Sequence, residues 1–219
     1  MGVLLMVSSN KIRESKTTTV GIRLKDYVVI AADKRATAGT YVSHKKVEKI
    51  QKITDNMAMT ISGLVADAQY LVNLARAVVN YYELETGVKP YVKTIASYLA
   101  NVLSSYSKIL PFIVQLLLAG YDTKPRLYYV DLFGTVSEEE YIATGSGSPT
   151  ALGVLENNYR EDLSIEEAKQ LALSAVKAAV ERDSWSGEGV DVVIIGRDVY
   201  SKETILFTPK HVVRTIEQE

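Results

Sequence analysis

Apolar and polar positions along the chain follow a period of two in some segments and of three to four in others. From Thr17 to Leu24 and from Tyr27 to Ala32, β-branched and other strand-forming residues dominate, and Lys25-Asp26 between them supplies a turn. This pattern predicts a β-hairpin. Further strands are expected near residue 42 and over 50–53, 57–62, 112–121, 126–131 and 190–195, with a short one reaching 143 and short elements at the end of the chain.

Two pairs of helices separate these strands. Apolar residues recur at spacings of three and four from Leu64 to Tyr82, which indicates one amphipathic helix. Gly87 and Pro90 are expected to end it before a second helix over 91–106. A helix should also follow the small-residue loop at 144–149, and the capping box Ser164-x-x-Glu167 predicts the start of a long fourth helix.

The order of elements is therefore strands, a helix pair, strands, a helix pair and a strand. A doubly wound parallel sheet would place a helix between every two strands, so this order favours a different architecture. We expect an α+β fold, a four-layer α/β/β/α sandwich of two mainly antiparallel sheets between helix pairs. No Pro/Gly-rich linker and no repeat of 20–50 residues divides the chain, so one domain is expected over 17–219, after a separate extension at 1–16.

Composition narrows the possible functions. The 219 residues include 25 Lys and Arg against 26 Asp and Glu, a formal net charge of −1, which argues against binding to nucleic acid or to anionic membranes. The longest apolar stretch, 110–120, is too short to span a bilayer, and segment 1–16 lacks a secretion-signal pattern, so a cytoplasmic location is expected. The chain has no cysteine and only two histidines, which excludes thiolate catalysis and leaves little basis for a metal site.

The chemistry that remains is that of hydroxyl and amine groups. The chain contains none of the common phosphate-binding or zinc-protease motifs. Taken singly, its short polar motifs are ordinary strand starts, strand ends and helix ends. Six of them nevertheless occur in a characteristic order: TTTVGI (17–22), AADKRAT (31–37), VEKI (47–50), ISGLVADAQ (61–69), TGSGSP (144–149) and RDSWSG (182–187).

With these motifs the chain resembles, from residue 17 to about 210, a proteasome β-type subunit of the archaeal kind, which is an N-terminal-nucleophile threonine peptidase. The resemblance implies the N-terminal nucleophile hydrolase fold, and its four layers agree with those inferred from periodicity. It also implies a threonine-type endopeptidase that degrades unfolded proteins to peptides inside a closed chamber.

The resemblance also assigns roles to individual residues. The family cuts the chain just before its nucleophile, here between Lys16 and Thr17, and the freed α-amine of Thr17 then accepts the proton of its own hydroxyl. Lys49 matches the family's lysine whose charge lies beside the nucleophile, and Asp33 matches the carboxylate that holds that lysine in place. The Gly63 N–H matches the donor that stabilises the oxyanion of the reaction intermediate. The supporting hydrogen-bond network matches Ser146, Asp183 and Ser186.

The positions that match the family's pocket for the side chain before the scissile bond are all apolar: Ala36, Val47, Ile61 and Val65. They predict cleavage after large hydrophobic residues. As partners, the resemblance implies proteasome α subunits, other β subunits in homo- or mixed heptameric rings stacked α-β-β-α, an ATP-driven unfolding ring and unfolded protein substrates. It implies no metal and no organic cofactor.

The sequence departs from the family pattern at two positions. Lys16 stands where the family has glycine, and its Cβ and charge fall at the bond to be cut. Two interpretations therefore stay open: an endopeptidase processed slowly or by a neighbour, or a structural β subunit that keeps its leader in a mixed ring. A simpler bacterial-type peptidase is a third. Trp185 replaces a small residue, and it either crowds the site or packs nearby.

Overall fold

Two antiparallel sheets form the centre of the protein. The computed structural model describes residues 17–38 and 41–207, so the predicted leader 1–16 and Lys16 lie outside the described residues. The first sheet has the order β10 (Tyr141–Thr144), β1 (Thr19–Arg23), β2 (Tyr27–Asp33), β11 (Gly189–Gly196) and β12 (Val199–Leu206). The second follows the chain through β5 (Ile50–Thr54), β6 (Met57–Gly63), β7 (Val114–Tyr121), β8 (Pro125–Val130) and β9 (Val136–Glu138). A small ribbon pairs β3 (Ala36–Ala38) with β4 (Tyr41–His44).

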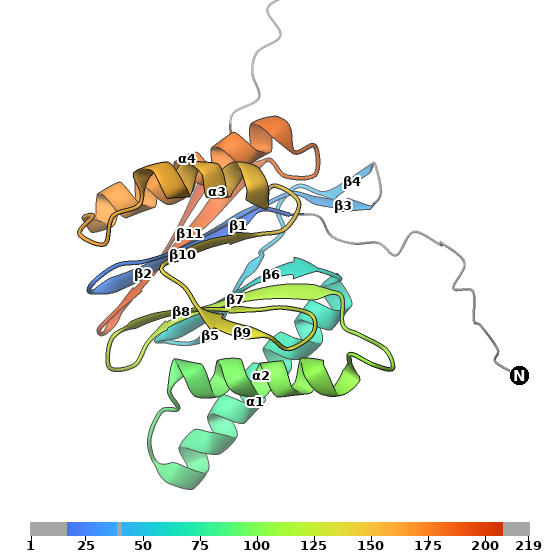
Figure 1. Ribbon diagram of the computed structural model, residues 1–219, viewed down its shortest axis with the longest axis vertical. Coiled ribbons are helices and arrows are strands. Elements are labelled where there is room, and N and C mark those ends of the chain that lie inside the picture. The colour runs from blue at the N-terminus through green and yellow to red at the C-terminus, as the bar shows by residue number, and fades with distance from the viewer. Residues whose placement is uncertain (1–16, 39–40, 208–219) are drawn as a thin grey trace, which may run out of the picture.

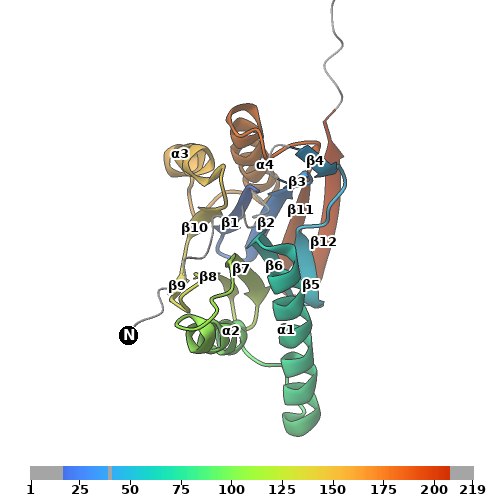
Figure 2. The same cartoon turned by 90° about the vertical axis from the view of Figure 1, so that its right-hand side faces the viewer.

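One helix pair covers the outer face of each sheet. Helices α1 (Val65–Thr86) and α2 (Val92–Tyr106) pack on the second sheet, and α3 (Ser148–Asn158) and α4 (Ile165–Arg182) pack on the first. Figure 1 shows the resulting order of layers, and Figure 2 shows the same layers from the side. The predicted four-layer α/β/β/α fold is confirmed.

The apolar core has three parts that correspond to the three gaps between layers. Ile30, Leu117 and Leu127 belong to the cluster between the two sheets. One further cluster lies under each helix pair, around Leu99 on one side and Val176 on the other. Because the central strands are covered on both faces, their sequences are nearly continuous apolar runs rather than alternating ones.

The predicted helix signals are confirmed. In the capping box of α4 the Ser164 side chain accepts from the Glu167 N–H, and the Glu167 carboxylate accepts from the Ser164 N–H. Gly87 ends α1 in the left-handed conformation, with φ of 71°. No helix within 17–38 or 41–207 is long and apolar enough to cross a bilayer.

The strand predictions need two corrections. The chain end was expected to hold only short elements, but β12 has eight residues. It is an edge strand with mostly exposed side chains, held by its pairing with β11, so its sequence lacks an apolar pattern. The prediction of a fully apolar strand over 190–195 is right about burial but wrong at Asp191, whose carboxylate accepts a hydrogen bond from the Lys34 ammonium at 2.5 Å.

Candidate active site

The carboxylate of Asp33, at the end of β2, is the centre of the candidate site. Its Oδ1 atom accepts hydrogen bonds from Thr17 Oγ1 at 2.8 Å, from Lys49 Nζ at 2.7 Å and from the Thr18 N–H at 3.0 Å. Its Oδ2 atom accepts from the backbone N–H groups of Arg35 and Gly187, both at 3.0 Å. Asp33 is fully buried, so these five donors replace the water that an ionised carboxylate requires.

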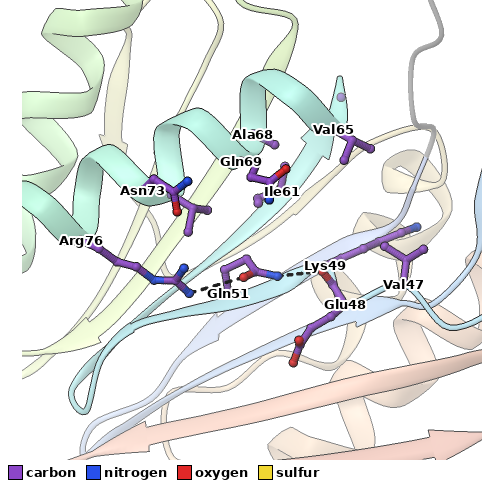
Figure 3. A pocket seen from close by; sticks show the side chains of 12 residues that line it. Val47, Glu48, Lys49, Gln51, Ile61, Val65, Ala68, Gln69, Asn73 and Arg76 are labelled. Atoms are coloured by element: carbon purple, nitrogen blue, oxygen red, sulfur yellow. Dashed lines mark hydrogen bonds between the residues drawn. The ribbon is translucent and has the colours of Figure 1, made fainter.

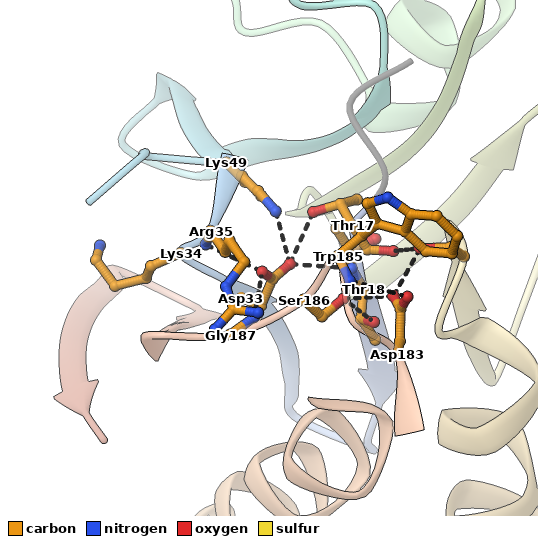
Figure 4. A network of polar contacts seen from close by, with 12 residues as sticks. Thr17, Thr18, Asp33, Lys34, Arg35, Lys49, Asp183, Trp185, Ser186 and Gly187 are labelled. Atoms are coloured by element: carbon orange, nitrogen blue, oxygen red, sulfur yellow. Dashed lines mark hydrogen bonds and ion pairs between the residues drawn. The ribbon is translucent and has the colours of Figure 1, made fainter. Parts of the chain in front are cut away.

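Strand pairing explains why these residues meet. Strands β1 and β2 are antiparallel with Thr19 opposite Ala32, and the Asp33 N–H donates to the Thr18 carbonyl, so Thr17 arrives beside the Asp33 side chain. Lys49 precedes β5 in the other sheet. The Lys49–Asp33 ion pair, drawn in Figure 4, therefore links the segment before β5 of one sheet to β2 of the other.

Burial and charge act in opposite directions on the Lys49 ammonium. Removal from water is the larger effect and lowers the pKa of Lys49 below its ordinary value of 10.5. The charges of Asp33 and Asp183 and the hydrogen bond to Asp33 oppose this effect and favour the charged form. The site thus holds an ammonium group that loses its proton more readily than an exposed lysine does.

A second network supports the backbone on the other side of Thr17. Asp183 Oδ2 accepts from Ser146 Oγ at 2.6 Å and from Ser186 Oγ at 2.8 Å. Ser146 Oγ also lies 3.5 Å from the Thr17 carbonyl oxygen, and Ser186 Oγ is hydrogen-bonded to Thr18 Oγ1 at 2.8 Å. The structure therefore brings the three predicted network residues together around the start of β1.

The loop at 144–149 is glycine-rich because it presses against this same segment. Gly145 has φ of +87°, and a Cβ there would lie 2.1 Å from the Thr17 carbonyl oxygen. Gly147 caps the start of α3. The loop is thus a helix entry, as its sequence alone suggests, and also one wall of the Thr17 site.

Gly63 lies where the site opens into a cavity. It ends β6 with φ of +123°, a conformation that side-chain-bearing residues avoid, and a Cβ would lie 2.1 Å from the Ile113 carbonyl oxygen. Gly63 and Lys49 both line a cavity of about 210 Å³ between β5, β6 and α1 (Figure 3). Since Lys49 also binds Asp33, this cavity adjoins the Thr17 hydroxyl.

The cavity contains three of the four predicted pocket residues. Val47, Ile61 and Val65 line it, together with Ala68 and Val72. Ala36 is not among the lining residues; it is buried in β3. The lining also includes polar side chains that no sequence pattern indicated: Glu48, Gln51, Gln69, Asn73 and Arg76.

Sequence reasoning missed several donors around the two carboxylates. The Arg35 and Gly187 N–H groups and the Thr18 hydroxyl lie inside motifs that were recognised, but no role was assigned to them. A backbone donor has no side-chain signature, so only the folded geometry reveals it. Thr18 was the one with an available signal, because it follows the candidate nucleophile directly.

Comparison with known proteins identifies the family. The family described as "Proteasome subunit" matches residues 14–195. "Proteasome subunit beta 2" of Staphylothermus marinus is 60% identical over 88% of this chain and 93% of its own length. The protein of the same description from Desulfurococcus amylolyticus is 61% identical over 87% of this chain and 93% of its own length. "Proteasome subunit beta" of Ferroglobus placidus is 43% identical over 92% of this chain and 95% of its own length.

The layered fold and these matches define a class of protein, and the chain belongs to the proteasome subunit family. Within it, the chain is a β-type subunit of the archaeal 20S kind. Membership of the β type makes it a peptidase subunit that assembles with α and β subunits in the core particle. The alternative of a purely structural β subunit is not favoured.

Proposed function

We propose that Thr17 is the nucleophile of this peptidase and that its own α-amine, freed by cleavage between Lys16 and Thr17, is the general base. One observation carries the proposal: the Thr17 hydroxyl and the Lys49 ammonium share a single oxygen of the buried Asp33 carboxylate. A threonine hydroxyl needs a nearby base to become nucleophilic. An α-amine has a reference pKa of about 7.7–8.0, which suits proton transfer near neutral pH.

In this mechanism Thr17 Oγ1 attacks the substrate carbonyl carbon while its proton moves to the α-amine. The Gly63 N–H stabilises the negative charge that develops on the substrate oxygen, a contribution of about 3–4 kcal/mol for one such donor. The C–N bond then breaks, the leaving amine takes the proton from the α-ammonium, and an ester to Thr17 remains. Water, activated by the same α-amine, hydrolyses that ester and restores the hydroxyl.

The charged Lys49 favours the neutral α-amine and a deprotonated hydroxyl, because a second positive charge nearby is unfavourable. Asp33 holds the Lys49 ammonium at 2.7 Å. Ser146, Asp183 and Ser186 fix the backbone around Thr17, which supports a role in positioning the α-amine.

The cavity supports a preference for large hydrophobic side chains before the scissile bond. Val47, Ile61 and Val65 form apolar walls next to Lys49 and Gly63. Fluorogenic peptides ending in Leu, Tyr, Arg or Glu test this preference. Faster cleavage after Arg or Glu than after Leu or Tyr would contradict it.

Lys16 makes maturation a separate question. We propose that cleavage before Thr17 occurs, but more slowly than with glycine at position 16, because the cut requires a tight backbone turn. Lys16→Gly is expected to speed removal of residues 1–16 on assembly, as measured by intact mass over time. Equal rates for the unaltered chain and the Lys16→Gly variant would show that this position does not limit maturation.

The cellular setting follows from the subunit class. We propose heptameric rings stacked α-β-β-α in the cytoplasm, supplied with unfolded chains by an ATP-driven unfolding ring. Whether the β ring contains one or two β types is tested by native mass spectrometry of the purified particle.

The nucleophile is tested with two substitutions in the assembled particle. Thr17→Ala should abolish the peptide hydrolysis that this subunit supplies and block processing, whereas Thr17→Ser keeps a hydroxyl and an α-amine and should retain both. Intact mass shows whether each chain begins at residue 17. A fully processed and fully active Thr17→Ala subunit would overturn the proposal.

A further inference from the structure

Three buried threonines form a chain of hydroxyl groups between the two sheets, close in sequence to Thr17. Thr60 Oγ1 on β6 donates to Thr19 Oγ1 on β1 at 3.2 Å, and the hydroxyls of Thr19 and Thr144 share a hydrogen bond of 2.7 Å. All three residues are at most 2% exposed. Thr19 therefore has one partner in its own sheet, on β10, and one in the opposite sheet, on β6.

This hydroxyl chain differs from the packing elsewhere between the sheets. The buried cluster in that gap consists of aliphatic side chains, among them Ala58 and Leu117. Alternate residues of a strand face the same side of its sheet, so Ala58 and Thr60 point into the same gap. Apolar burial has no preferred direction, whereas a hydrogen bond keeps its two atoms about 2.7–3.2 Å apart in a preferred orientation. The Thr60–Thr19 bond thus fixes the spacing of β6 and β1 where it lies.

The two strands that this bond joins lead to the two halves of the proposed reaction centre. Thr17 lies two residues before Thr19, and Gly63 lies three residues after Thr60, at the end of β6. In the proposed mechanism one substrate carbonyl meets Thr17 Oγ1 at its carbon and the Gly63 N–H at its oxygen. Because β1 and β6 belong to different sheets (Figure 1), the spacing of the sheets sets the spacing of these two groups.

A second hydrogen bond crosses the gap at the residue that follows Thr144. The Gly145 N–H donates to Gln115 Oε1 on β7, the strand next to β6, at 3.1 Å. Gly145 also presses on the Thr17 segment, since a Cβ there would lie 2.1 Å from the Thr17 carbonyl oxygen. Both cross-sheet hydrogen bonds therefore act on the segments that hold the nucleophile and the oxyanion donor.

We infer that Thr60 is a positioning residue: through its hydrogen bond to Thr19 it holds the Gly63 N–H at the distance from Thr17 Oγ1 that the reaction requires. The inference rests on the proposed function of Thr17. A misplacement of about 1 Å between reacting groups can cost about a hundredfold in rate, so a smaller shift is expected to cost about tenfold. Thr60 does not line the cavity, so its loss should leave binding of the substrate side chain unchanged.

Thr60→Val tests this role, because valine keeps the β-branched shape and the Thr19 hydroxyl keeps Thr144 as a partner. In assembled particles, kcat per processed subunit should fall about tenfold, while the inhibition constant of an unreactive peptide amide, which reports binding to the cavity, should change less than about twofold. Thr60→Ser keeps the hydroxyl and should retain kcat within about threefold. Thr204→Val, which removes one threonine hydrogen bond on β12, is the control and should leave kcat unchanged.

A peptide boronate supplies the second readout, because its adduct with Thr17 directs a boronate oxygen to the Gly63 N–H. Its affinity should decline in Thr60→Val by the same factor as kcat. The inference is overturned if Thr60→Val retains kcat, if the affinities for amide and boronate decline together, or if Thr60→Ser or Thr204→Val loses as much kcat as Thr60→Val. If the unaltered particle binds no boronate at Thr17, the proposed function itself has failed, and this inference with it.

Discussion

Two buried lysine–carboxylate pairs lie close together in this fold, and only one of them belongs to the candidate site. Lys49 contacts Asp33 at 2.7 Å, and Lys34 contacts Asp191 at 2.5 Å. All four side chains are at least nine-tenths buried, and Asp33 and Asp191 lie on the neighbouring strands β2 and β11. By burial and distance the two pairs are nearly equivalent.

The two pairs differ in what else the carboxylate binds. Asp191 accepts a second hydrogen bond from Thr204 on β12, so this pair ties the edge strand to the sheet. Asp33 instead accepts the hydroxyl of Thr17, and its lysine lines the cavity. A buried ion pair is therefore weak evidence for catalysis by itself. The hydrogen bond to the proposed nucleophile and the access to a cavity distinguish the Lys49–Asp33 pair of the candidate site.

The largest expected difference is in activity. Asp33→Asn should reduce kcat/KM by about a hundredfold or more, because it removes the charge that holds Lys49 beside the Thr17 hydroxyl. Asp191→Asn, the matched substitution in the other pair, should change kcat/KM less than about threefold. Both are measured per assembled and processed subunit. Similar losses in the two variants would break the distinction drawn between the pairs.

The expected effects on stability are large for both pairs. Lys49→Met and Lys34→Met each leave a buried carboxylate without its cation, which costs about 3–5 kcal/mol. Thermal unfolding at fixed particle concentration measures the loss. Only Lys49→Met should also abolish peptide hydrolysis in the fraction that remains folded. An inactive but folded Lys34→Met particle would mean that its pair also serves the site.

The pH dependence of kcat/KM sharpens the role of Lys49. Activity should rise with pH as the α-amine of Thr17 loses its proton, and fall again as Lys49 loses its own. Because burial lowers the pKa of Lys49, this decline should begin at a lower pH than that of an ordinary lysine, whose pKa is 10.5. Lys49→Arg keeps a charge at all these pH values, so its residual activity should lack the decline. An unchanged alkaline decline in that variant would assign it to another group.

The smallest effect is expected at the hydroxyl that accompanies the structural pair. Thr204→Val removes the hydrogen bond to Asp191 Oδ1 but keeps the β-branched shape that suits a strand. The expected cost is about 1 kcal/mol in the free energy of unfolding, with no change in kcat/KM. Ser186→Ala is the matched loss of one hydroxyl, here beside Thr18. Unlike Thr204→Val, it should reduce kcat/KM in addition to lowering the free energy of unfolding.

Periodicity alone was sufficient for most of the architecture. The hairpin at 17–33, the paired helices and the capping box at Ser164 follow from local rules, because amphipathic period, turn chemistry and caps depend on neighbouring residues. The edge strand β12 was underestimated, because its stability comes from the hydrogen-bond ladder with β11 rather than from its own apolar residues.

The sequence by itself predicted a class of chemistry for this peptidase subunit. The absence of cysteine excluded thiolate catalysis, and the family resemblance of six ordered motifs predicted Thr17 as the nucleophile, with Asp33, Lys49 and Gly63 beside it. The sequence could not show that a single oxygen of Asp33 binds both the Thr17 hydroxyl and the Lys49 ammonium. That arrangement arises only when the two sheets pack together, since Thr17 and Lys49 precede strands of different sheets.

Tertiary structure also decided the shape of the cavity and the separation of the two ion pairs. The polar residues Gln51, Asn73 and Arg76 join the apolar wall because α1 packs against β5, a contact between segments whose local patterns are independent. Asp191, a charged residue inside an otherwise apolar strand, is accommodated because the fold places Lys34 beside it. Local sequence determines which groups are present, whereas packing in three dimensions decides which of them share a carboxylate, a cavity or a proton.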